Sequence, residues 1–209
     1  MDAILSEAAG AARELMIADG QLCYWACAFD QQESDRLLLE LRQRIEWQQE
    51  EILIFGRRTL VPRLVAWYGD PVASYTYSGT RHEPRPWTIA LLGIRARVEA
   101  LTGAAFNSVL LNLYRDGSDS MGWHSDDEPE LGRDPQIASV SLGATRRFRM
   151  QHRRRKSEVL SVDLGHGSLL LMAGETQHHW RHCVPKTAAR VGERINLTFR
   201  RISPPGQPD

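Results

Sequence analysis

The sequence predicts a mainly β domain of the α+β class, an antiparallel sandwich or barrel supported by helices from the N-terminal half. After about residue 107, seven short segments alternate apolar and polar residues and are separated by glycine, aspartate and proline, as in antiparallel sandwiches and barrels. No helical pattern alternates with these segments, which disfavours a parallel doubly wound sheet. The chain of 209 residues, 42% hydrophobic and 25% charged, is long enough for one domain with a sizeable core.

Two segments before these strands have the periodicity of amphipathic helices. Residues 34–50 place apolar residues on one face, and Ser34 or Asp35 is suited to cap the first turn. Residues 86–103 repeat apolar residues at helical spacing and end at Gly103, a residue type that commonly terminates helices. We expect both helices to pack against one face of the β structure.

The same periodicities divide the chain. We expect residues 1–20, which are rich in alanine, to form an N-terminal extension that is either a loose helix or disordered. Residues 21–202 then form a single domain, and residues 203–209 form a flexible tail. The seven expected strands lie at 107–114, 136–143, 146–152, 157–164, 167–174, 178–185 and 194–202.

Composition argues against several classes of protein. The formal net charge is zero, which disfavours nucleic-acid binding by bulk charge but leaves a local basic patch open. No apolar run approaches the ~18–20 residues of a membrane span, and the N-terminus lacks the features of a signal peptide. We therefore expect a cytoplasmic protein, nuclear in a eukaryote, with no membrane partner. Cys23, Cys27 and Cys183 form no C-x-x-C pair, so neither a disulfide scaffold nor a structural zinc site is expected.

The stretch GWHSDDE is the first candidate for chemistry. His124 and Asp126 have the spacing H-x-D, and residues i and i+2 of a strand project from the same face, so an imidazole and a carboxylate can meet one ion. A distant histidine would complete the two-histidine, one-carboxylate site of non-haem iron(II), and the candidates are His178, His179 and His182. The plain alternative is a solvated acidic loop, which this motif alone does not exclude.

The last predicted strand, RINLTFR, is the second candidate. One of its faces is apolar. The other carries two guanidinium groups, an amide and a hydroxyl, from Arg194, Asn196, Thr198 and Arg200. An edge strand facing water would have this pattern, and so would a strand lining a pocket for a dicarboxylate. The two arginines lie roughly 20 Å apart along an extended strand, so both reach one small acid only by converging.

Four segments occur in an order shared with a known family. They are NLY at 112–114, HSDDE at 124–128, the His182 of HWRHCVP, and RINLTFR at 194–200. Together they resemble the AlkB family of iron(II)- and 2-oxoglutarate-dependent nucleic-acid dioxygenases. The resemblance covers about residues 50–202 and is closest to the branch that repairs alkylated bases in duplex DNA. It implies a double-stranded β-helix, or jelly roll, with a nucleotide-recognition segment at about residues 50–82.

The resemblance also implies which residues hold the reactants. His124, Asp126 and His182 would ligate iron(II), which suits imidazole and carboxylate ligands. Charge-assisted bonds from Arg194 and Arg200 would fix the carboxylates of 2-oxoglutarate. The side chains that would assist them are Asn112, Tyr114, Asn196 and Thr198. Dioxygen is the remaining co-substrate.

The activity implied is oxidative demethylation of N-alkylated bases in DNA, such as 1-methyladenine and 3-methylcytosine. This direct reversal of alkylation damage releases formaldehyde, succinate and carbon dioxide. A base within a duplex cannot reach the iron, so the target nucleotide must be flipped out. By resemblance, Tyr75 and Tyr77 belong to the segment that binds this base, and Tyr77 stacks on it opposite the His124 ring. Asp127 and Glu128 would accept hydrogen bonds from its exocyclic amino group, and their charge would favour a cationic base.

Two further features are expected to contact nucleic acid. Phe55 matches the position at which the duplex-acting branch inserts an aromatic wedge, and Gly56 suggests a turn there; the alternative is an ordinary core phenylalanine. Residues 146–156 contain the only dense cationic run, which could equally be a solvated face. Within it, the residues expected to bind the phosphate backbone are Arg153, Arg154 and Arg155.

Three hypotheses follow. The leading one is a monomeric demethylase of alkylated DNA, acting on duplex, with single-stranded DNA or RNA as alternative substrates. The second is a 2-oxoglutarate dioxygenase that acts on single-stranded RNA or on a protein. The third is a non-catalytic nucleic-acid-binding module with a degenerate site, which is disfavoured because every expected iron and co-substrate position holds a competent residue.

Overall fold

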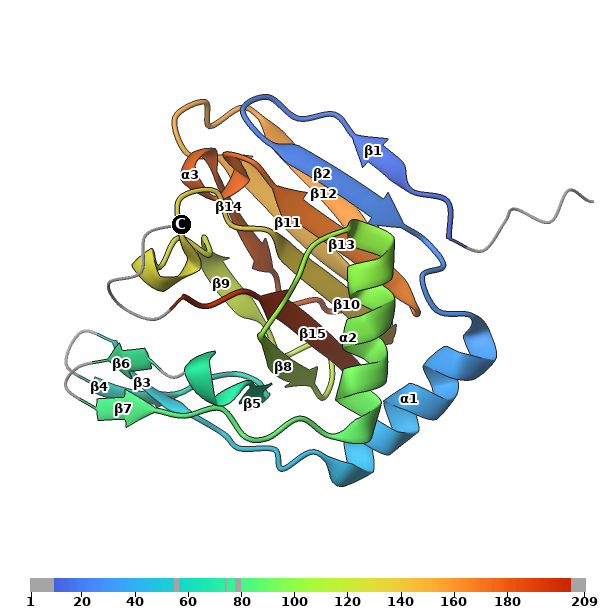
Figure 1. The fold of residues 1–209 in the computed structure, drawn as a ribbon. Coiled ribbons are helices and arrows are strands. Elements are labelled where there is room, and N and C mark those ends of the chain that lie inside the picture. Colours follow the sequence, from blue (N-terminus) through green and yellow to red (C-terminus); the bar gives the residue numbers. More distant parts are fainter. Residues whose placement is uncertain (1–9, 55–56, 74, 78–79, 204–209) are drawn as a thin grey trace, which may run out of the picture.

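Two antiparallel sheets pack face to face in the computed structural model, which describes residues 10–54, 57–73, 75–77 and 80–203 (Figure 1). The larger sheet has seven strands, in the order β1 (Arg13–Leu15), β2 (Gln21–Trp25), β13 (Ser168–Ala173), β10 (Ile137–Gly143), β15 (Arg194–Arg200), β8 (Ser108–Tyr114) and β5 (Leu64–Gly69). The smaller sheet has four, in the order β12 (Val159–Leu164), β11 (Arg146–His152), β14 (Trp180–Val184) and β9 (Met121–His124).

The chain crosses between the two sheets at almost every connection from β8 onward. The larger sheet takes β8, β10, β13 and β15, and the smaller sheet takes β9, β11, β12 and β14, so only the β11–β12 connection stays within one sheet. This alternation is the topology of a double-stranded β-helix. The predicted fold class, a mainly β jelly roll with helices from the N-terminal half, is confirmed.

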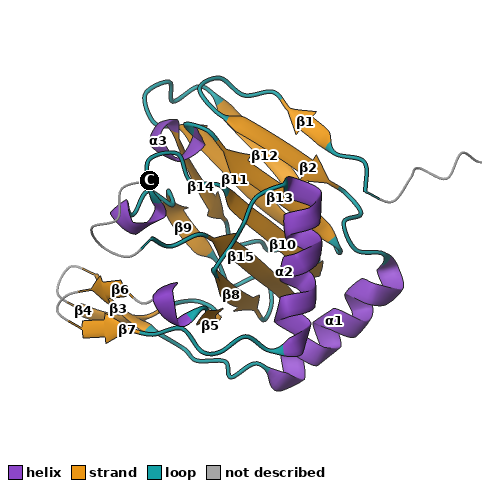
Figure 2. Cartoon of the chain, in the orientation of Figure 1, coloured by secondary structure: helices purple, strands orange, loops and turns teal. Residues whose placement is uncertain are grey.

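Two helices cover the outer face of the larger sheet (Figures 1 and 2). The helix α2 (Ile89–Thr102) agrees with the prediction: Thr88 caps its first turn, and Gly103 ends it at a φ of 70°. The helix α1 (Gln31–Arg44) was predicted at 34–50 and differs at both ends. No helix among the described residues is long and apolar enough to cross a membrane.

The start of α1 is shifted because Asp30 is its N-cap. The Asp30 carboxylate accepts a hydrogen bond from the backbone N–H of Glu33 at 2.8 Å. Ser34, one of the predicted caps, instead lies in the second turn and is fully buried, with its hydroxyl directed at the carbonyl of Phe29. The helix ends before Ile45, whose backbone is extended, and Gln48 then forms a bridge with Val65 of β5.

All seven strands predicted after residue 107 are present, but other strands were missed. These are β1, β2, β5 and β9, with the hairpins β3 (Glu51–Ile54) with β4 (Arg57–Leu60) and β6 (Tyr75–Tyr77) with β7 (Thr80–His82). The expectation of a loose helix within residues 1–20 is wrong for residues 13–15, which pair with β2 and extend the larger sheet. Residues 1–9 and 204–209 lie outside the described residues.

The remaining helical elements are single turns. They are the helix α3 (Thr176–His179) and the 3₁₀ turns Pro71–Ala73 and Pro129–Leu131. The helix α3 directly precedes β14, so it sets where that strand enters the smaller sheet.

The core has two layers, one on each side of the larger sheet. The first joins α1 and α2 to the larger sheet, through residues such as Leu41, Ile94 and Leu197. The second lies between the two sheets and includes Phe148, Met172 and Trp180. Because the larger sheet is covered on both faces, the side chains on both faces of its central strands are buried. Polar residues on the inner face are therefore enclosed rather than solvated.

Candidate active site

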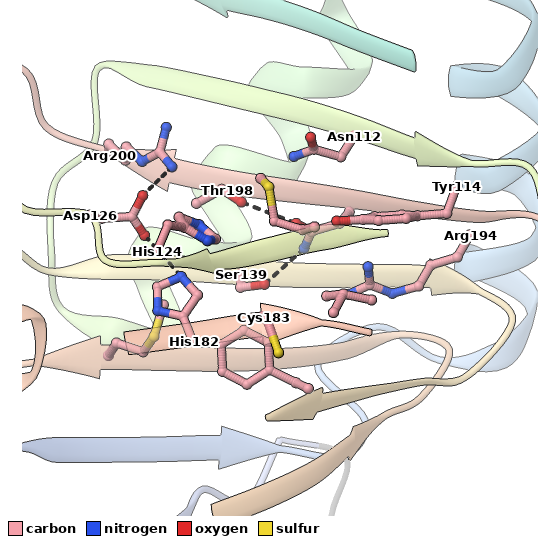
Figure 3. A pocket seen from close by; sticks show the side chains of 15 residues that line it. Asn112, Tyr114, His124, Asp126, Ser139, His182, Cys183, Arg194, Thr198 and Arg200 are labelled. Carbon is pink, nitrogen blue, oxygen red and sulfur yellow. Dashed lines mark hydrogen bonds and ion pairs between the residues drawn. The ribbon is translucent and has the colours of Figure 1, made fainter. Parts of the chain in front are cut away.

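A polar pocket lies between the two sheets (Figure 3). Strands of the larger sheet form one wall, and strands of the smaller sheet form the other. Its polar lining residues are Asn112, Tyr114, His124, Asp126, Ser139, His182, Arg194, Asn196, Thr198 and Arg200. The structure thus brings together all of the residues that were predicted to bind iron or 2-oxoglutarate.

The arginine strand β15 is central in its sheet, between β10 and β8. Ile195, Leu197 and Phe199 point into the helix-side core and are fully buried. The alternating residues, which begin at Arg194, face the pocket on the opposite side. The alternative of an edge strand that faces water is therefore wrong.

One carboxylate and two imidazoles converge at the open end of this pocket. His124, Asp126 and His182 offer ligand atoms that all lie within 4.8 Å of one another. The His182 Nε2 atom is 3.6 Å from Asp126 Oδ2, and the two imidazole ring centroids are 4.3 Å apart. His124 Nδ1 is 2.9 Å from the carbonyl oxygen of Gly122, which can only accept, so Nδ1 carries the proton and Nε2 is free to bind a metal.

Both buried members of this cluster are in the protonation state that a metal requires. Burial lowers the pKa of His182 to about 3, and the positive charge of Arg200 acts in the same direction, so its imidazole is neutral. Burial opposes the ionisation of Asp126, but the positive charge and the hydrogen bond of Arg200 hold the pKa of its carboxyl below the ordinary value. A neutral imidazole and an ionised carboxylate are both competent ligands.

A bulge in the smaller sheet aims the histidines at each other. His182 of β14 pairs with His124 of β9, whereas Val184 pairs with Met121, so β9 advances three residues where β14 advances two. The extra residue lets both His124 and Met121 face the pocket although they are three residues apart.

Asp126 reaches the cluster from a loop, and not from the strand that the H-x-D spacing suggested. The strand β9 ends at His124, and the backbone N–H of Asp126 donates to the side-chain oxygen of Gln177 at 2.9 Å. Arg200 donates to Asp126 Oδ1, which leaves Oδ2 directed at His182. Gln177 was not singled out in the sequence, and its complete burial within α3 is a tertiary property without a local sequence signal.

The other two candidate histidines lie elsewhere. His178 Nε2 contacts the carbonyl oxygen of Arg133 and is 3.2 Å from Asp134. The His179 ring stacks on His152, with centroids 5.8 Å apart. Of the three, only His182 is brought to His124 and Asp126.

Arg194 is a buried cation at the closed end of the pocket. It is 1% exposed, and its Nη2 donates to the Ser141 hydroxyl at 2.9 Å. Its Nε and Nη1 atoms have no hydrogen-bond partner among the described residues. Burial lowers the pKa of this guanidinium, although the nearby Tyr114 acts in the opposite direction. Since an uncompensated buried charge is costly, the pocket is built for an anionic group at this point.

Asn112 presents a donor to the same pocket because Arg63 holds its oxygen. Arg63 Nε lies 2.7 Å from Asn112 Oδ1, and a guanidinium has no acceptor, so the contacting amide atom must be oxygen. Arg63 also donates to the carbonyl oxygen of Ser120, just before β9. The sequence analysis missed Arg63, because a lone arginine after a proline has no pattern that indicates a pocket.

Asn196 and Thr198 are bonded mainly to the protein itself. The Asn196 amide nitrogen donates to the Ser139 hydroxyl at 2.8 Å and to the Val140 carbonyl at 3.0 Å, and the Thr198 hydroxyl donates to Asn196 Oδ1. The two Asn196 bonds cross from β15 to β10, the Thr198 bond lies within β15, and together they fix the floor of the pocket between the histidine–aspartate cluster and Arg194.

At the mouth, the two acidic residues after the cluster differ in their contacts. Asp127 forms an ion pair with Arg153 at 2.8 Å, and both side chains are about half exposed. Glu128 is exposed and precedes the turn Pro129–Leu131. Asp127, which was predicted to bind the base, is therefore paired with Arg153, which was predicted to bind phosphate.

The cationic run 146–156 does not form one patch, because strand alternation divides it. Arg146 is buried and donates to the backbone carbonyls of Asp116, Asp119 and Pro185, whereas the next arginine points outward and pairs with Asp163. In the following turn Arg155 pairs with Asp19 and Glu158. Arg154 has no ion pair among the described residues.

Several predicted nucleic-acid contacts are not described by the structure. Phe55 and Gly56 lie outside the described residues, at the connection between β3 and β4. Tyr75 and Tyr77 belong to β6, but their side chains are also outside what is described. The wedge and the stacking platform remain predictions.

Comparison with known proteins identifies the family to which this site belongs. The sequence pattern of the 2OG-Fe(II) oxygenase superfamily matches residues 21–200. The chain belongs to this superfamily. DNA oxidative demethylase ALKBH2 of Mus musculus is 42% identical over 197 residues, which cover 90% of this chain and 82% of that protein. Alpha-ketoglutarate-dependent dioxygenase alkB homolog 3 of Homo sapiens is 42% identical over 193 residues, 88% of this chain and 67% of that protein.

A solved structure agrees on the fold of this oxygenase. The structure of OsALKBH1 superposes with a TM-score of 0.63 at 14% identity, covering 90% of this chain and all of that one. At that identity the likeness concerns the fold alone.

The residues present fit the reactants of a 2OG-Fe(II) oxygenase, which uses iron(II), 2-oxoglutarate and dioxygen. Two imidazoles and one carboxylate on one side of a metal are the ligand set typical of non-haem iron(II), with open positions left for co-substrates. The two free N–H directions of Arg194 suit a carboxylate, which accepts paired bonds from a guanidinium.

Proposed function

We propose that this oxygenase removes methyl groups from N-alkylated bases in DNA, with 1-methyladenine and 3-methylcytosine as substrates. The products are the repaired base, formaldehyde, succinate and carbon dioxide. The relatives named as DNA oxidative demethylases support the choice of DNA over protein. The observation that carries the chemistry is the buried Arg194, whose free N–H groups share one pocket with the His124, Asp126 and His182 cluster.

In this proposal the two ends of the pocket act on the two ends of 2-oxoglutarate. Arg194 binds the distal carboxylate, and the Asn112 amide, oriented by Arg63, donates to the end nearer the iron. Arg200 binds the other carboxylate of 2-oxoglutarate, and its bond to Asp126 Oδ1 keeps that side chain ionised. Tyr114, Asn196 and Thr198 assist the two arginines. His124, Asp126 and His182 would hold iron(II), which would supply the oxidising chemistry, and the chain supplies orientation and a pocket shielded from water.

The flipped base is proposed to enter at the mouth. Tyr77 stacks on one face of it and the His124 ring on the other, while Asp127 and Glu128 accept hydrogen bonds from its exocyclic amino group. A methylated Watson–Crick edge already weakens pairing, which lowers the cost of flipping. Phe55 is proposed to fill the gap left in the duplex, and Arg153, Arg154 and Arg155 to contact phosphates.

The test of this function is mass spectrometry of a duplex oligonucleotide that carries one 1-methyladenine. We expect loss of one methyl group when protein, iron(II), 2-oxoglutarate, ascorbate and air are present, and no loss when 2-oxoglutarate is omitted. Succinate formation without loss of the methyl group from DNA or RNA would show an oxygenase with a different substrate.

The preference for duplex DNA is tested with Phe55→Ala. Because the wedge is needed only where a base stack must be filled, this variant should lose repair of duplex far more than repair of a single strand. Equal loss on both substrates would contradict the proposed role of Phe55 as a wedge.

We also propose that the protein acts as a monomer, since one chain supplies every residue of the site. Its place of action would be that of the DNA, which is the cytoplasm, or the nucleus in a eukaryote. Sedimentation with and without DNA checks the monomer.

A further inference from the structure

The outer face of the smaller sheet, which points away from the pocket, carries an aromatic ring between guanidinium groups. Trp123 is 39% exposed, although large apolar side chains are usually covered. The guanidinium carbon of Arg181 lies 5.0 Å from the Trp123 ring centroid, and that of Arg149 lies 5.8 Å away. Both distances are within the range of cation–π interactions.

Strand alternation places these residues on one face. In β11, Phe148 and Met150 point into the core and Arg149 points outward. In β14, His182 points into the pocket, so its neighbour Arg181 points outward. The bulge in β9 turns Met121 and His124 inward and leaves Trp123 on the outer face.

The two arginines beside the tryptophan are not neutralised. Arg147, two residues before Arg149 on the same face, donates two hydrogen bonds to Asp163, at 2.9 and 3.1 Å. In contrast, neither Arg149 nor Arg181 forms an ion pair with any carboxylate among the described residues. Among the described residues, the Arg181 side chain donates its hydrogen bonds to the neutral amide oxygen of Gln151. In a chain of zero net charge, this face therefore keeps an excess of positive charge.

A guanidinium that lies against an aromatic ring keeps its N–H donors at the edge of its plane. Such an arrangement orders the long side chain without using its hydrogen bonds, and it suits the recognition of phosphate. The face is a sheet surface rather than a cavity, so its ligand is extended and anionic. A nucleic-acid strand has both properties.

The charged face is continuous with the mouth of the site. Arg153 follows β11 directly and pairs with Asp127, which is next to the cluster residue Asp126. Arg149 lies four residues earlier, roughly 13 Å along the strand. A strand that is bound at the mouth can thus continue onto this face.

We propose that Trp123, Arg149 and Arg181 form a phosphate-binding platform for the part of the substrate strand that extends beyond the target nucleotide. This inference rests on the proposed function, and it assigns a binding role to a face outside the reaction pocket. The platform binds the backbone and reads no sequence, so it increases the affinity for long strands over short ones.

Affinity measured against strand length tests the platform. Fluorescence anisotropy is recorded for the full chain, without 2-oxoglutarate, on single strands of five and of twenty nucleotides that carry one 1-methyladenine. We expect the double variant R149Q/R181Q to bind the long strand about tenfold more weakly at low salt, with a salt slope smaller by ~1.4 for two lost phosphate contacts. Its affinity for the short strand should stay within about twofold.

The matched control is R147Q/D163N, which removes a neutralised pair from the same face. It should bind both strands as the wild type does. Trp123→Leu removes the ring and no charge, and it should weaken long-strand binding by about threefold because the guanidinium groups lose their support. Thermal melting of each variant confirms that the sheet is folded.

The possible outcomes separate the platform from the proposed function. Unchanged long-strand binding in R149Q/R181Q would overturn the platform and leave the face for a protein partner. Equal losses on both strands would also overturn it, because the effect would then lie at the mouth. If the wild type bound the long strand through the platform but demethylated neither strand, the proposed function would fail while the platform remained.

Discussion

Two clusters of one carboxylate and two imidazoles occur in the described part of the chain, and only one is suited to a metal. His124, Asp126 and His182 form the first, and Asp19, His152 and His179 form the second. In each, the candidate ligand atoms lie within 4.8 Å of one another. Residue types and spacing therefore do not distinguish them.

The difference lies in the hydrogen bonds to the second nitrogen of the ring. His152 Nδ1 accepts from the backbone N–H groups of Arg154 and Arg155, at 3.2 and 3.0 Å, so its proton must be on Nε2. That proton is directed at Asp19, which also accepts from the Arg155 side chain at 2.7 Å. The lone pair that a metal needs is therefore absent from His152.

In the first cluster the proton of the histidine ring is on the other nitrogen. His124 Nδ1 donates to a carbonyl oxygen, so Nε2 presents a lone pair, and Asp126 keeps one oxygen directed at His182. From this comparison we infer that the hydrogen-bond partners behind the ligands distinguish the cluster that is suited to a metal.

Metal content is the largest expected difference between the clusters. Asp126→Ala should remove the bound iron(II) and reduce 2-oxoglutarate-dependent turnover by more than ~100-fold, since even residues behind the ligands cost 10–100-fold. Asp19→Asn should retain one metal per chain and full turnover. Metal analysis after dialysis against iron(II) or manganese(II) measures both. Loss of metal in the Asp19 variant would contradict the comparison.

Arg194, at the closed end of the pocket that holds the first cluster, differs from the arginine beside the second cluster. Arg155 is paired with Asp19 and Glu158, whereas Arg194 has free N–H groups in its buried setting. Arg194→Met should weaken binding of 2-oxoglutarate by about 10- to 100-fold, the value of a charge-assisted hydrogen bond.

Thermal melting provides the control for this variant. Without 2-oxoglutarate, Arg194→Met should be as stable as the wild type or more stable, because an apolar side chain replaces an uncompensated buried charge. Added 2-oxoglutarate should raise the Tm of the wild type and not that of the variant. A destabilised variant that still responds to 2-oxoglutarate would show that Arg194 is structural.

A smaller effect is expected from the residue that orients Asn112. Arg63→Met should raise the KM for 2-oxoglutarate about threefold to tenfold and leave kcat nearly unchanged, because one neutral donor loses its orientation. Arg63→Lys, which keeps a donor, should recover part of the loss.

The double variant R63M/N112A tests whether Arg63 acts through Asn112. If it does, adding Arg63→Met to Asn112→Ala should change the KM no further. Additive losses would instead mean that Arg63 contacts the substrate or the fold independently.

The smallest expected effect is on thermal stability, to which the hydrogen bonds of Asp19 in the second cluster contribute. Hydrogen bonds from Arg155 and His152 lower the pKa of Asp19 from 3.8, so its ionised form is favoured in the folded state. That stabilisation is present above the ordinary pKa and is lost as the pH falls through the lower folded-state pKa. Asp19→Asn should thus lower the Tm slightly at pH 7, and the difference should vanish in acid.

Asparagine is the appropriate replacement for this test. Asp19 has a φ of 52°, a conformation that asparagine adopts more readily than other residues, so the backbone is not strained by the change. A Tm difference that persists at the acid limit would show that the charge is not the cause.

Much of the fold was predictable because it depends on local periodicity. Alternation along the chain indicated all seven strands after residue 107, and Gly103 marked the end of α2. The strand β1 and the strand β9 were missed because three or four residues are too short to show a period. The start of α1 was misplaced because Asp30 and Ser34 are both good caps, and only the burial of Ser34 under Phe29 and Gly167 distinguishes them.

The features of the candidate site are likewise of two kinds, those that depend on local sequence and those that depend on tertiary structure. Sequence by itself determined the residue types, the H-x-D spacing and the alternation of RINLTFR, because these depend on neighbours along the chain. Only the tertiary structure decided that His182 rather than His178 joins Asp126 and that Gln177 and Arg63 support the site. It also decided that Arg194 is buried with two nitrogen atoms that have no hydrogen-bond partner among the described residues. The physical reason is that a lone pair, a desolvated charge and a shared hydrogen bond depend on groups that the fold brings together from distant parts of the chain.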